Sequence, residues 1–454
     1  MDIVANNPET VEYRVALFDS SWPLLMVAAE AEGYRLPRVR IPRWTRPAEE
    51  INDALRRDWQ LNTLVLTILY PGDERSACAV AEVLPSADAC FPRDLALQDI
   101  EQLSDSDLDP SERLSIRNLI AGDGSIAGPF SRRGWFKEAQ VWIQNSIPNR
   151  TIEFSRDFRQ YNASATYALA RLGTTQGRTY WLKATGDPNR HECALTVELS
   201  KLFPDHLPKL IAVRKEWNAW VTEDAGQSLG CTQDQNILIS AVEAFADLQI
   251  QSLDHIAHLR AAGCMDRSLH TLQKHLGPMF EFLEEAMKLQ VSTRSRPLTP
   301  ARLREIAEVV DEACNEMLAL AIPLSLVNGD INLDNILFDG VAYRFIDWAE
   351  GGIGNPFLTL QQMIQNVTRD GDHNEWVPSL RAAYRAKWRP LLSEDAIDSA
   401  FSLMPLLTMA DYLYGRGDWL VSKRREDASF QSFARTLARC MDRATAELSL
   451  KGAI

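Results

Sequence analysis

The sequence predicts an α+β protein in which a small α/β domain precedes a β-rich lobe and a larger helical region. Residues 1–140 mix strand-like runs with an amphipathic helix, residues 141–226 contain mainly strand-like runs, and residues 227–454 show helical spacing of apolar residues. A chain of 454 residues also exceeds the usual size of one hydrophobic core. We therefore expect these three regions to be separate domains or lobes.

The first region is predicted from two kinds of element that alternate along the chain. VEYRVALFD and TLVLTILY are rich in β-branched and aromatic residues, as strands are, and ACAVAEVL is a candidate for a further strand. AEEINDALRRDW has the spacing of an amphipathic helix. The pattern indicates a small α/β domain.

The second region, residues 141–226, contains four strand-like runs and one helical run. ATYALARLG and RTYWLKA are two strands separated by the turn TTQG, and LPKLIAV and AWVTED are two more. HECALTVELSKLF carries apolar residues at Leu195, Leu199 and Leu202, which favours a helix. This region is expected to be a β-rich lobe.

The third region, residues 227–454, is mostly helical. AVEAFADLQIQSLDHI and ARLREIAEVVDEACNEML both have helical spacing of apolar residues. Thr299 is a candidate N-cap of the second helix, with Pro300 at its first position. One short β segment interrupts the helices, and it holds the polar residues that indicate chemistry.

The composition indicates which binding partners to expect and in which cellular compartment the protein is found. The formal net charge is −14 and no large cluster of Lys and Arg occurs, so nucleic acid is not an expected partner. The seven cysteines contain no CxxC pair, which is typical of reduced thiols in the cytoplasm. The N-terminus lacks an apolar signal core, and the longest apolar run, residues 64–70, is too short to span a membrane. We expect a cytoplasmic protein without membrane contact, and the sequence does not predict its oligomeric state.

The polar segment spans residues 324–348, LSLVNGDINLDNILFDGVAYRFIDW. LSLV reads as a short buried strand, followed by a polar loop from Asn328 to Asn335. ILF and AYRFID flank Asp339-Gly340, a strong hairpin signal. Because a hairpin returns the chain to its starting end, we expect Asp347 to lie near Asn335.

This segment gathers the oxygen-bearing side chains that phosphoryl transfer requires. Mg²⁺ prefers oxygen ligands, which Asn335 and Asp347 can supply beside the phosphates of a nucleotide. A separate carboxylate must accept the proton, or a hydrogen bond, from the attacking hydroxyl group, and Asp330 fits that role. The predicted site therefore consists of Asp330 as base and Asn335 and Asp347 as metal ligands.

NGDINLDN followed by FIDWAEGGIGNPF resembles the aminoglycoside phosphotransferase and choline kinase family. The family signature is HGDxxxxN, followed by a strand that ends in IDW or IDF. Asn328 replaces the signature His, whose role is usually structural, and Asn can also donate and accept hydrogen bonds. The resemblance implies a bilobal protein-kinase-like fold. It also implies transfer of the γ-phosphate of ATP, with Mg²⁺, to a hydroxyl group of a small molecule such as an aminoglycoside, an amino sugar or a choline-like compound.

The resemblance further implies a strand Lys paired with a helix Glu upstream of this segment. Lys183 in TYWLKA matches the Lys, and Glu192 matches the Glu better than Glu198 does. In this family pattern Lys183 would hold the α- and β-phosphates, and Glu192 would fix its side chain.

The remaining nucleotide contacts are also inferred from the resemblance. No GxGxxG occurs, so the phosphate loop would be the turn around residues 162–165, where Ser164 is a candidate donor or a local cap. WVTEDAG matches the interlobe hinge of the family. Backbone groups from Glu223 to Ala225 would contact adenine, with Thr222 behind it.

The first 140 residues resemble the Nudix-like N-terminal domain that some relatives carry. They contain no Nudix box, because AEEINDALRRDW lacks the REXXEE arrangement. We therefore interpret this region as a non-catalytic domain.

The sequence also bears on two other classes of function. A catalytically weak pseudokinase or nucleotide-binding regulatory module is suggested by Asn328 and by the added N-terminal domain, but every base and metal position is retained. A protein kinase is disfavoured by the absence of HRD, DFG and APE motifs. The acceptor is expected against helices within residues 362–420, where Trp376, Tyr412 and Trp419 either stack on a sugar or pack in the core.

Overall fold

The computed structural model of the protein describes residues 10–19, 24–30, 33–43, 45–71, 76–85, 91–121, 128–147, 152–293, 295–370, 373–416 and 422–451. The chain divides into two compact units. Unit 1 comprises Met1–Cys193 and Lys209–Asp224, and unit 2 comprises Ala194–Pro208 and Ala225–Ile454. Unit 1 holds the two large sheets and unit 2 most of the helices, which confirms the predicted α+β class.

The first sheet of unit 1 has seven strands in the order β3-β2-β1-β6-β5, with β4 paired to β1 and β7 paired to β2. The runs VEYRVALFD, TLVLTILY and ACAVAEVL lie in β1, β5 and β6, as predicted. The strands are β1 (Thr10–Asp19), β2 (Leu25–Glu30), β3 (Gly33–Arg35), β4 (Arg38–Pro42), β5 (Thr63–Leu69), β6 (Cys78–Val83) and β7 (Leu95–Gln98).

Both faces of this sheet are covered, which explains why its central strands are apolar at successive positions. Val15 and Leu17 of β1 pack in one core cluster with residues of α1 (Pro47–Trp59). Ala16 and Phe18 point to the opposite face and pack with residues of α2 (Pro110–Ala121) and α3 (Trp135–Ser146). The helix predicted from AEEINDALRRDW is α1.

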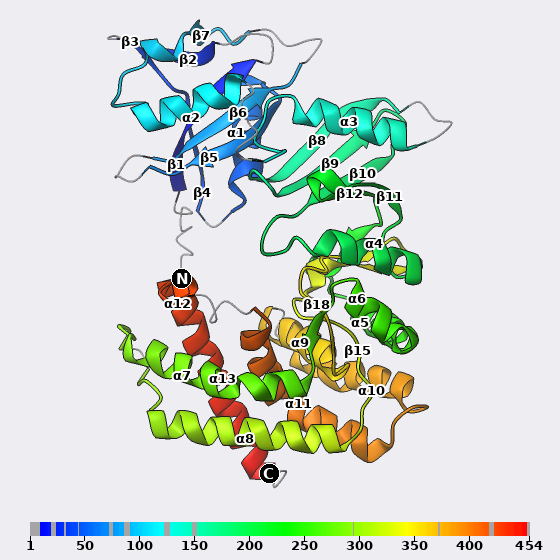
Figure 1. The fold of residues 1–454 in the computed structure, drawn as a ribbon. Helices are drawn as coiled ribbons and strands as arrows, with labels where there is room; N and C mark the ends of the chain where they lie inside the picture. The colour runs from blue at the N-terminus through cyan, green and yellow to red at the C-terminus, as the bar shows by residue number, and fades with distance from the viewer. Residues whose placement is uncertain are drawn as a thin grey trace, which may run out of the picture. The chain divides into compact units, whose positions relative to one another are not determined.

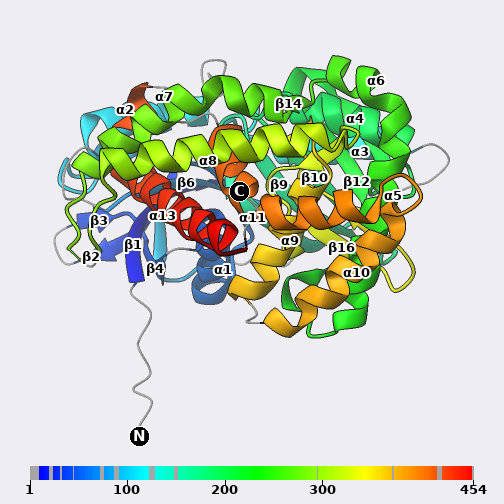
Figure 2. The same cartoon turned by 90° about the horizontal axis from the view of Figure 1, so that it is seen from below.

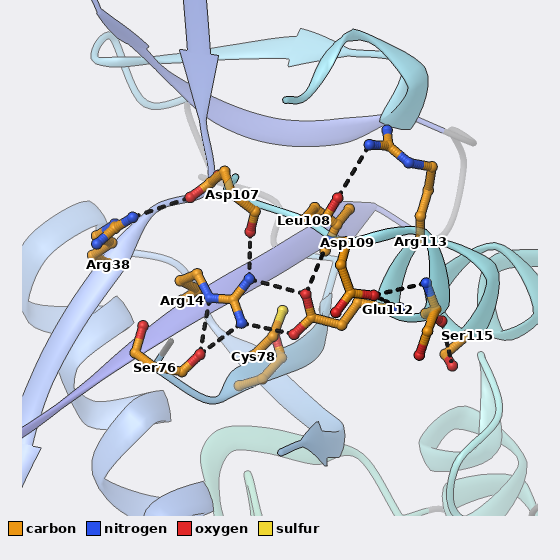
Figure 3. A network of polar contacts seen from close by, with 12 residues as sticks. Arg14, Arg38, Ser76, Cys78, Asp107, Leu108, Asp109, Glu112, Arg113 and Ser115 are labelled. Atoms are coloured by element: carbon orange, nitrogen blue, oxygen red, sulfur yellow. Dashed lines mark hydrogen bonds and ion pairs between the residues drawn. The ribbon is translucent and has the colours of Figure 1, made fainter. Parts of the chain in front are cut away.

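A buried charged network attaches α2 to the sheet (Figure 3). Arg14 of β1 is 1% exposed, and its guanidinium donates to Glu112 Oε1 at 2.7 Å. Glu112 Oε2 also accepts from the Asp109 backbone N–H at 3.1 Å, while Asp109 Oδ1 accepts from the Glu112 N–H at 2.8 Å. This reciprocal pair is a capping box at the start of α2. The network therefore stabilises the helix start and its position on β1 together.

The second sheet of unit 1 is antiparallel, in the order β11-β12-β10-β9-β8. Helix α3 lies over this sheet (Figure 1). Its buried apolar residues belong to one core cluster that also includes residues of both sheets. The boundary predicted at residue 140 falls inside α3, and a separate first domain stays a prediction. The strands are β8 (Phe154–Ala163), β9 (Ala168–Thr174), β10 (Thr179–Ala184), β11 (Leu210–Arg214) and β12 (Ala219–Glu223).

Unit 2 is built around one large core cluster of helical residues. Helices α7 and α8 run alongside each other, with α13 beside them (Figure 2). Thr299 caps α8 as predicted, since its Oγ1 accepts from the Arg302 N–H at 3.2 Å. The helices are α4 (Glu192–Leu202, from residue 194 in unit 2), α5 (Gln235–Ser252), α6 (Ile256–Ala261), α7 (Leu269–Lys288), α8 (Pro300–Ala319), α9 (Phe357–Asp370), α10 (Val377–Trp388), α11 (Glu394–Arg416), α12 (Ser422–Arg425) and α13 (Ala428–Lys451).

Two small sheets interrupt the helices of unit 2, in the orders β13-β16-β17 and β14-β18-β15. β16 and β17 form the predicted hairpin, with Ile336 opposite Phe345. The strands are β13 (Gln227–Ser228), β14 (Met265–Arg267), β15 (Ser325–Asn328), β16 (Ile336–Phe338), β17 (Tyr343–Phe345) and β18 (Gly351–Gly354). Short 3₁₀ helices are η1 (Ile100–Gln102), η3 (Lys215–Trp217), η4 (Leu229–Cys231), η5 (Leu253–His255), η6 (Leu333–Asn335) and η7 (Asn374–Trp376). Among the described helices, none combines the length and the apolar character that a membrane span requires.

Candidate active site

The loop after β15 is held by the side chain of Asn328, which is 1% exposed. Its Nδ2 donates to the backbone carbonyl of Asp347 at 3.0 Å, and its Oδ1 accepts from the Asp330 N–H at 3.0 Å. One amide group therefore joins the base position to the predicted metal position. This is the hydrogen-bonding capacity for which Asn was expected to suffice in place of His.

Asn335 closes the same loop. Its Nδ2 donates to the Asp330 carbonyl at 3.1 Å, and its own backbone carbonyl accepts from the Ile346 N–H at 3.0 Å. The second bond brings the end of the β16–β17 hairpin beside Asn335, as the hairpin argument predicts. Because the amide nitrogen is used within the loop, Oδ1 is the side-chain atom of Asn335 that can act as a metal ligand.

Asp347 follows the hairpin in a left-handed backbone conformation, with φ of 61°. Non-glycine residues rarely adopt this conformation, and such strain is common at functional sites. The hydrogen bond from Asn328 to the Asp347 carbonyl, together with Trp348 Nε1 donating to the Phe345 carbonyl at 3.1 Å, holds the turn in place. The backbone is thus fixed on both sides of the Asp347 side chain.

A buried ion pair packs against the loop at Gly329. The pair joins Arg267 Nη2, on β14, to Asp411 Oδ2, on α11, at 2.5 Å, and the two side chains are 1% and 2% exposed. A Cβ at Gly329 would come within 1.9 Å of Arg267 Nη1, so a side chain at this position would displace the buried guanidinium. Burial lowers the pKa of Arg267, but its neighbours, chiefly the Asp411 carboxylate and also Glu350, together raise it above its ordinary value. Arg267 was not among the residues predicted from the sequence.

Tyr412, the neighbour of Asp411, reaches the base position itself. Its hydroxyl lies 3.4 Å from Asp330 Oδ1. From the sequence, Tyr412 was expected only to stack on a sugar or to pack in the core, because this contact joins positions 82 residues apart. Of the other two aromatic residues, Trp376 is 8% exposed and stacks on His373, whereas Trp419 lies outside the described residues.

In unit 1 the structure brings Lys183 and Glu192 together. Lys183 Nζ, on β10, lies 2.6 Å from Glu192 Oε1 at the start of α4, and the Glu192 side chain is 1% exposed. Glu198, the weaker candidate, instead contacts Lys201 at 2.6 Å and His258 at 3.0 Å. The predicted Lys–Glu pair is therefore formed with Glu192.

The remaining nucleotide candidates have backbone or local contacts. Ser164 Oγ accepts from the N–H groups of Thr166 and Tyr167, both at 3.3 Å, so it caps its own turn. The structure thus shows the local-cap alternative for Ser164, and its predicted contact with a phosphate stays a prediction.

The predicted hinge begins within the sheet. Thr222 lies on β12 opposite Trp181 and Leu210. The backbone N–H of Glu223 donates to the Lys209 carbonyl at 2.9 Å, and its carboxylate pairs with the Lys209 side chain at 3.1 Å. Ala225 is the first residue after β12 that belongs to unit 2. The Glu223 N–H is therefore already bonded within the sheet, and the predicted contact of this hinge with adenine stays a prediction.

The two predicted metal ligands, Asn335 and Asp347, suit Mg²⁺ better than they suit a metal ion that takes all its ligands from protein side chains. In the described part of the chain, no three or more His, Cys, Asp or Glu residues cluster as a metal site. Mg²⁺ commonly takes one or two protein ligands together with substrate phosphates and water. One carboxylate, of Asp347, and one amide oxygen, of Asn335, fit that pattern.

One family model matches the chain. Residues 171–393, just under half of the chain, match the model of the phosphotransferase enzyme family. The class of protein is thus a phosphotransferase with a protein-kinase-like fold, as the sequence resemblance implied.

Solved structures similar to this chain include small-molecule kinases. A choline kinase from Cryptosporidium parvum has 15% identity and a TM-score of 0.47, over 69% of this chain and 97% of that one. An ethanolamine kinase from Plasmodium vivax has 11% identity and a TM-score of 0.43, over 65% and 83%. A macrolide 2'-phosphotransferase from Brachybacterium faecium has 15% identity and a TM-score of 0.41, over 66% and 97%. None of the curated proteins compared with the chain matches it.

Proposed function

We propose that the protein transfers the γ-phosphate of ATP, with Mg²⁺, to a hydroxyl group of a small molecule. The observation that carries this proposal is the hydrogen-bonded set of Asp330, Asn335 and Asp347 in a chain that matches the phosphotransferase family model. The three residues belong to one loop and the hairpin that follows it, and hydrogen bonds to their backbone groups link them. Phosphoryl transfer depends on such positioning and on charge stabilisation more than on covalent chemistry by the protein.

Each residue of the set has a distinct role in this proposal. Asp330 accepts the proton, or a hydrogen bond, of the attacking hydroxyl and orients it towards phosphorus. Asn335 Oδ1 and the Asp347 carboxylate hold the metal ion, which when bound neutralises charge on the phosphates. Asn328 and Asn335 keep the loop in one conformation through their bonds to Asp347 and Asp330.

Lys183 is assigned to the α- and β-phosphates of the nucleotide. Glu192 orients its ammonium group through the 2.6 Å contact, and this buried carboxylate also restricts the Lys183 rotamer. Backbone groups near residues 223–225, with Thr222, and the hydroxyl of Ser164 complete the proposed nucleotide contacts.

The regulatory alternative was suggested by the loss of the signature His and by the added N-terminal domain. The two hydrogen bonds of Asn328 supply what that position needs, so the substitution does not favour a pseudokinase. A cytoplasmic location, where ATP is available, fits an ATP-dependent enzyme.

The test is Mg²⁺-dependent ADP release across a panel of hydroxylated molecules: aminoglycosides, amino sugars, simple sugars, choline and homoserine. Asp330→Ala provides the blank. A rise that depends on one acceptor and is absent from the blank supports the proposal and identifies the acceptor class. ATP binding without turnover on any acceptor would favour the regulatory alternative, and no ATP binding would overturn the proposal.

A further inference from the structure

A pocket of about 320 Å³ lies between α10 and α11 within unit 2. None of the residues that line it belongs to the set assigned to phosphate transfer. Positions three, four or seven apart on a helix share one face, and the lining residues follow this spacing on both helices. They include Pro378, Arg381 and Arg385 of α10 and Asp398, Phe401 and Ser402 of α11.

Arg381 of this pocket has no carboxylate partner among the described residues. Its Nε is buried and has no hydrogen-bond acceptor, and within the described residues its guanidinium makes neither a hydrogen bond nor an ion pair. Its Cζ lies 5.3 Å from the centroid of the Phe401 ring. Burial lowers the pKa of Arg381, and no neighbouring carboxylate acts against this effect.

The carboxylates near the pocket are already paired with other arginines. Asp398 contacts Arg385, and Glu394 contacts Arg385 at 2.6 Å and Arg389 at 2.5 Å. The pocket therefore has one cation more than its carboxylates neutralise. A partly buried charge without a partner is destabilising, and an anion from solution would remove that cost.

We propose that this pocket binds a small molecule through an oxyanion group, a carboxylate or a phosphate, held by Arg381. The planar guanidinium forms paired hydrogen bonds to either group, and the Ser402 hydroxyl is a second donor on the pocket wall. Pro378 and Phe401 provide apolar surface for the carbon part of the ligand. The volume is at the lower end of the range for small-molecule sites, roughly 300–1,000 Å³.

The experiment is calorimetric titration of the full chain at constant ionic strength, with inorganic phosphate in one arm and acetate and citrate in the other. Wild type is compared with Arg381→Met, which keeps the length of the stem but removes the donors. Arg389→Met is the matched control, because Arg389 is on the same helix but pairs with Glu394. The loss of a charged hydrogen bond predicts binding weaker by roughly tenfold or more in Arg381→Met and unchanged binding in Arg389→Met.

Phosphate bound by the nucleotide residues is unaffected by Arg381→Met, so the site is defined by the difference between the two titrations. The arm with the stronger difference identifies the group as phosphate or carboxylate. Arg381→Lys keeps the charge without the planar fork and should bind with an intermediate affinity, which provides a second test if the Met variant misfolds. Equal binding by wild type and both Arg381 variants, or no saturable binding in either arm, would overturn the proposal.

Discussion

Asp411→Ala should destabilise unit 2 strongly, because it leaves the Arg267 guanidinium buried without its closest carboxylate. The two side chains are 1% and 2% exposed and lie 2.5 Å apart. Removing one partner of a buried pair typically costs about 3–5 kcal/mol. Glu350, 3.8 Å from Arg267, offsets part of this loss, so we expect the lower end, about 3 kcal/mol.

The assay is urea unfolding, read as the free energy of unfolding of each variant. Asp442→Ala is the matched control, since Asp442 pairs with Arg302 at 2.6 Å but both side chains are about one-third exposed, at 31% and 34%. Exposed pairs contribute roughly 0–1 kcal/mol, so this control should remain close to wild type. Replacing both buried partners, in Arg267→Met/Asp411→Leu, should recover much of the loss. An Asp411→Ala variant no less stable than Asp442→Ala would refute the reasoning.

Three other changes give distinct readouts. Lys183→Ala should raise the KM for ATP or slow transfer, since it removes the cation that Glu192 orients; unchanged kinetics would contradict the assignment. Tyr412→Phe removes the hydroxyl that lies 3.4 Å from Asp330 Oδ1. Because one hydrogen bond contributes about 1 kcal/mol or slightly more, kcat should fall by a factor of about 10. A kcat equal to wild type would mean that the reaction does not use this contact. In native protein at pH 8, iodoacetamide should modify the exposed Cys231 well before Cys314, because burial raises the pKa of the Cys314 thiol to about 12; equal rates by peptide mapping would contradict this.

The parts of the site that the sequence predicted are those encoded by local spacing. Asp330 and Asn335 are five residues apart in one loop, and the Asp339-Gly340 turn brings Asp347 back to that loop. The roles of these residues stay predictions, but a hairpin signal was sufficient to place them together. The pairing of Lys183 with Glu192 was predicted from the family resemblance, which implies a Lys on a strand followed by a Glu on the next helix.

The parts that the sequence did not predict depend on contacts between distant segments. Arg267 and Asp411 are 144 residues apart, and nothing in CMDRSL marks an arginine that will be buried beneath Gly329. The same holds for the first region. Helical and strand patterns predicted its elements, but not that residues of α3 would pack with both sheets of unit 1 in one cluster. Periodicity shows which face of an element is apolar and not which element covers it.

Phosphate transfer and ATP binding by Asp330→Ala, measured on the same sample, test the central claim most directly. The account predicts that transfer to the acceptor is lost while the dissociation constant for ATP stays close to the wild-type value, because Asp330 serves the hydroxyl and not the nucleotide. Wild-type turnover by this variant would show that Asp330 is not the base.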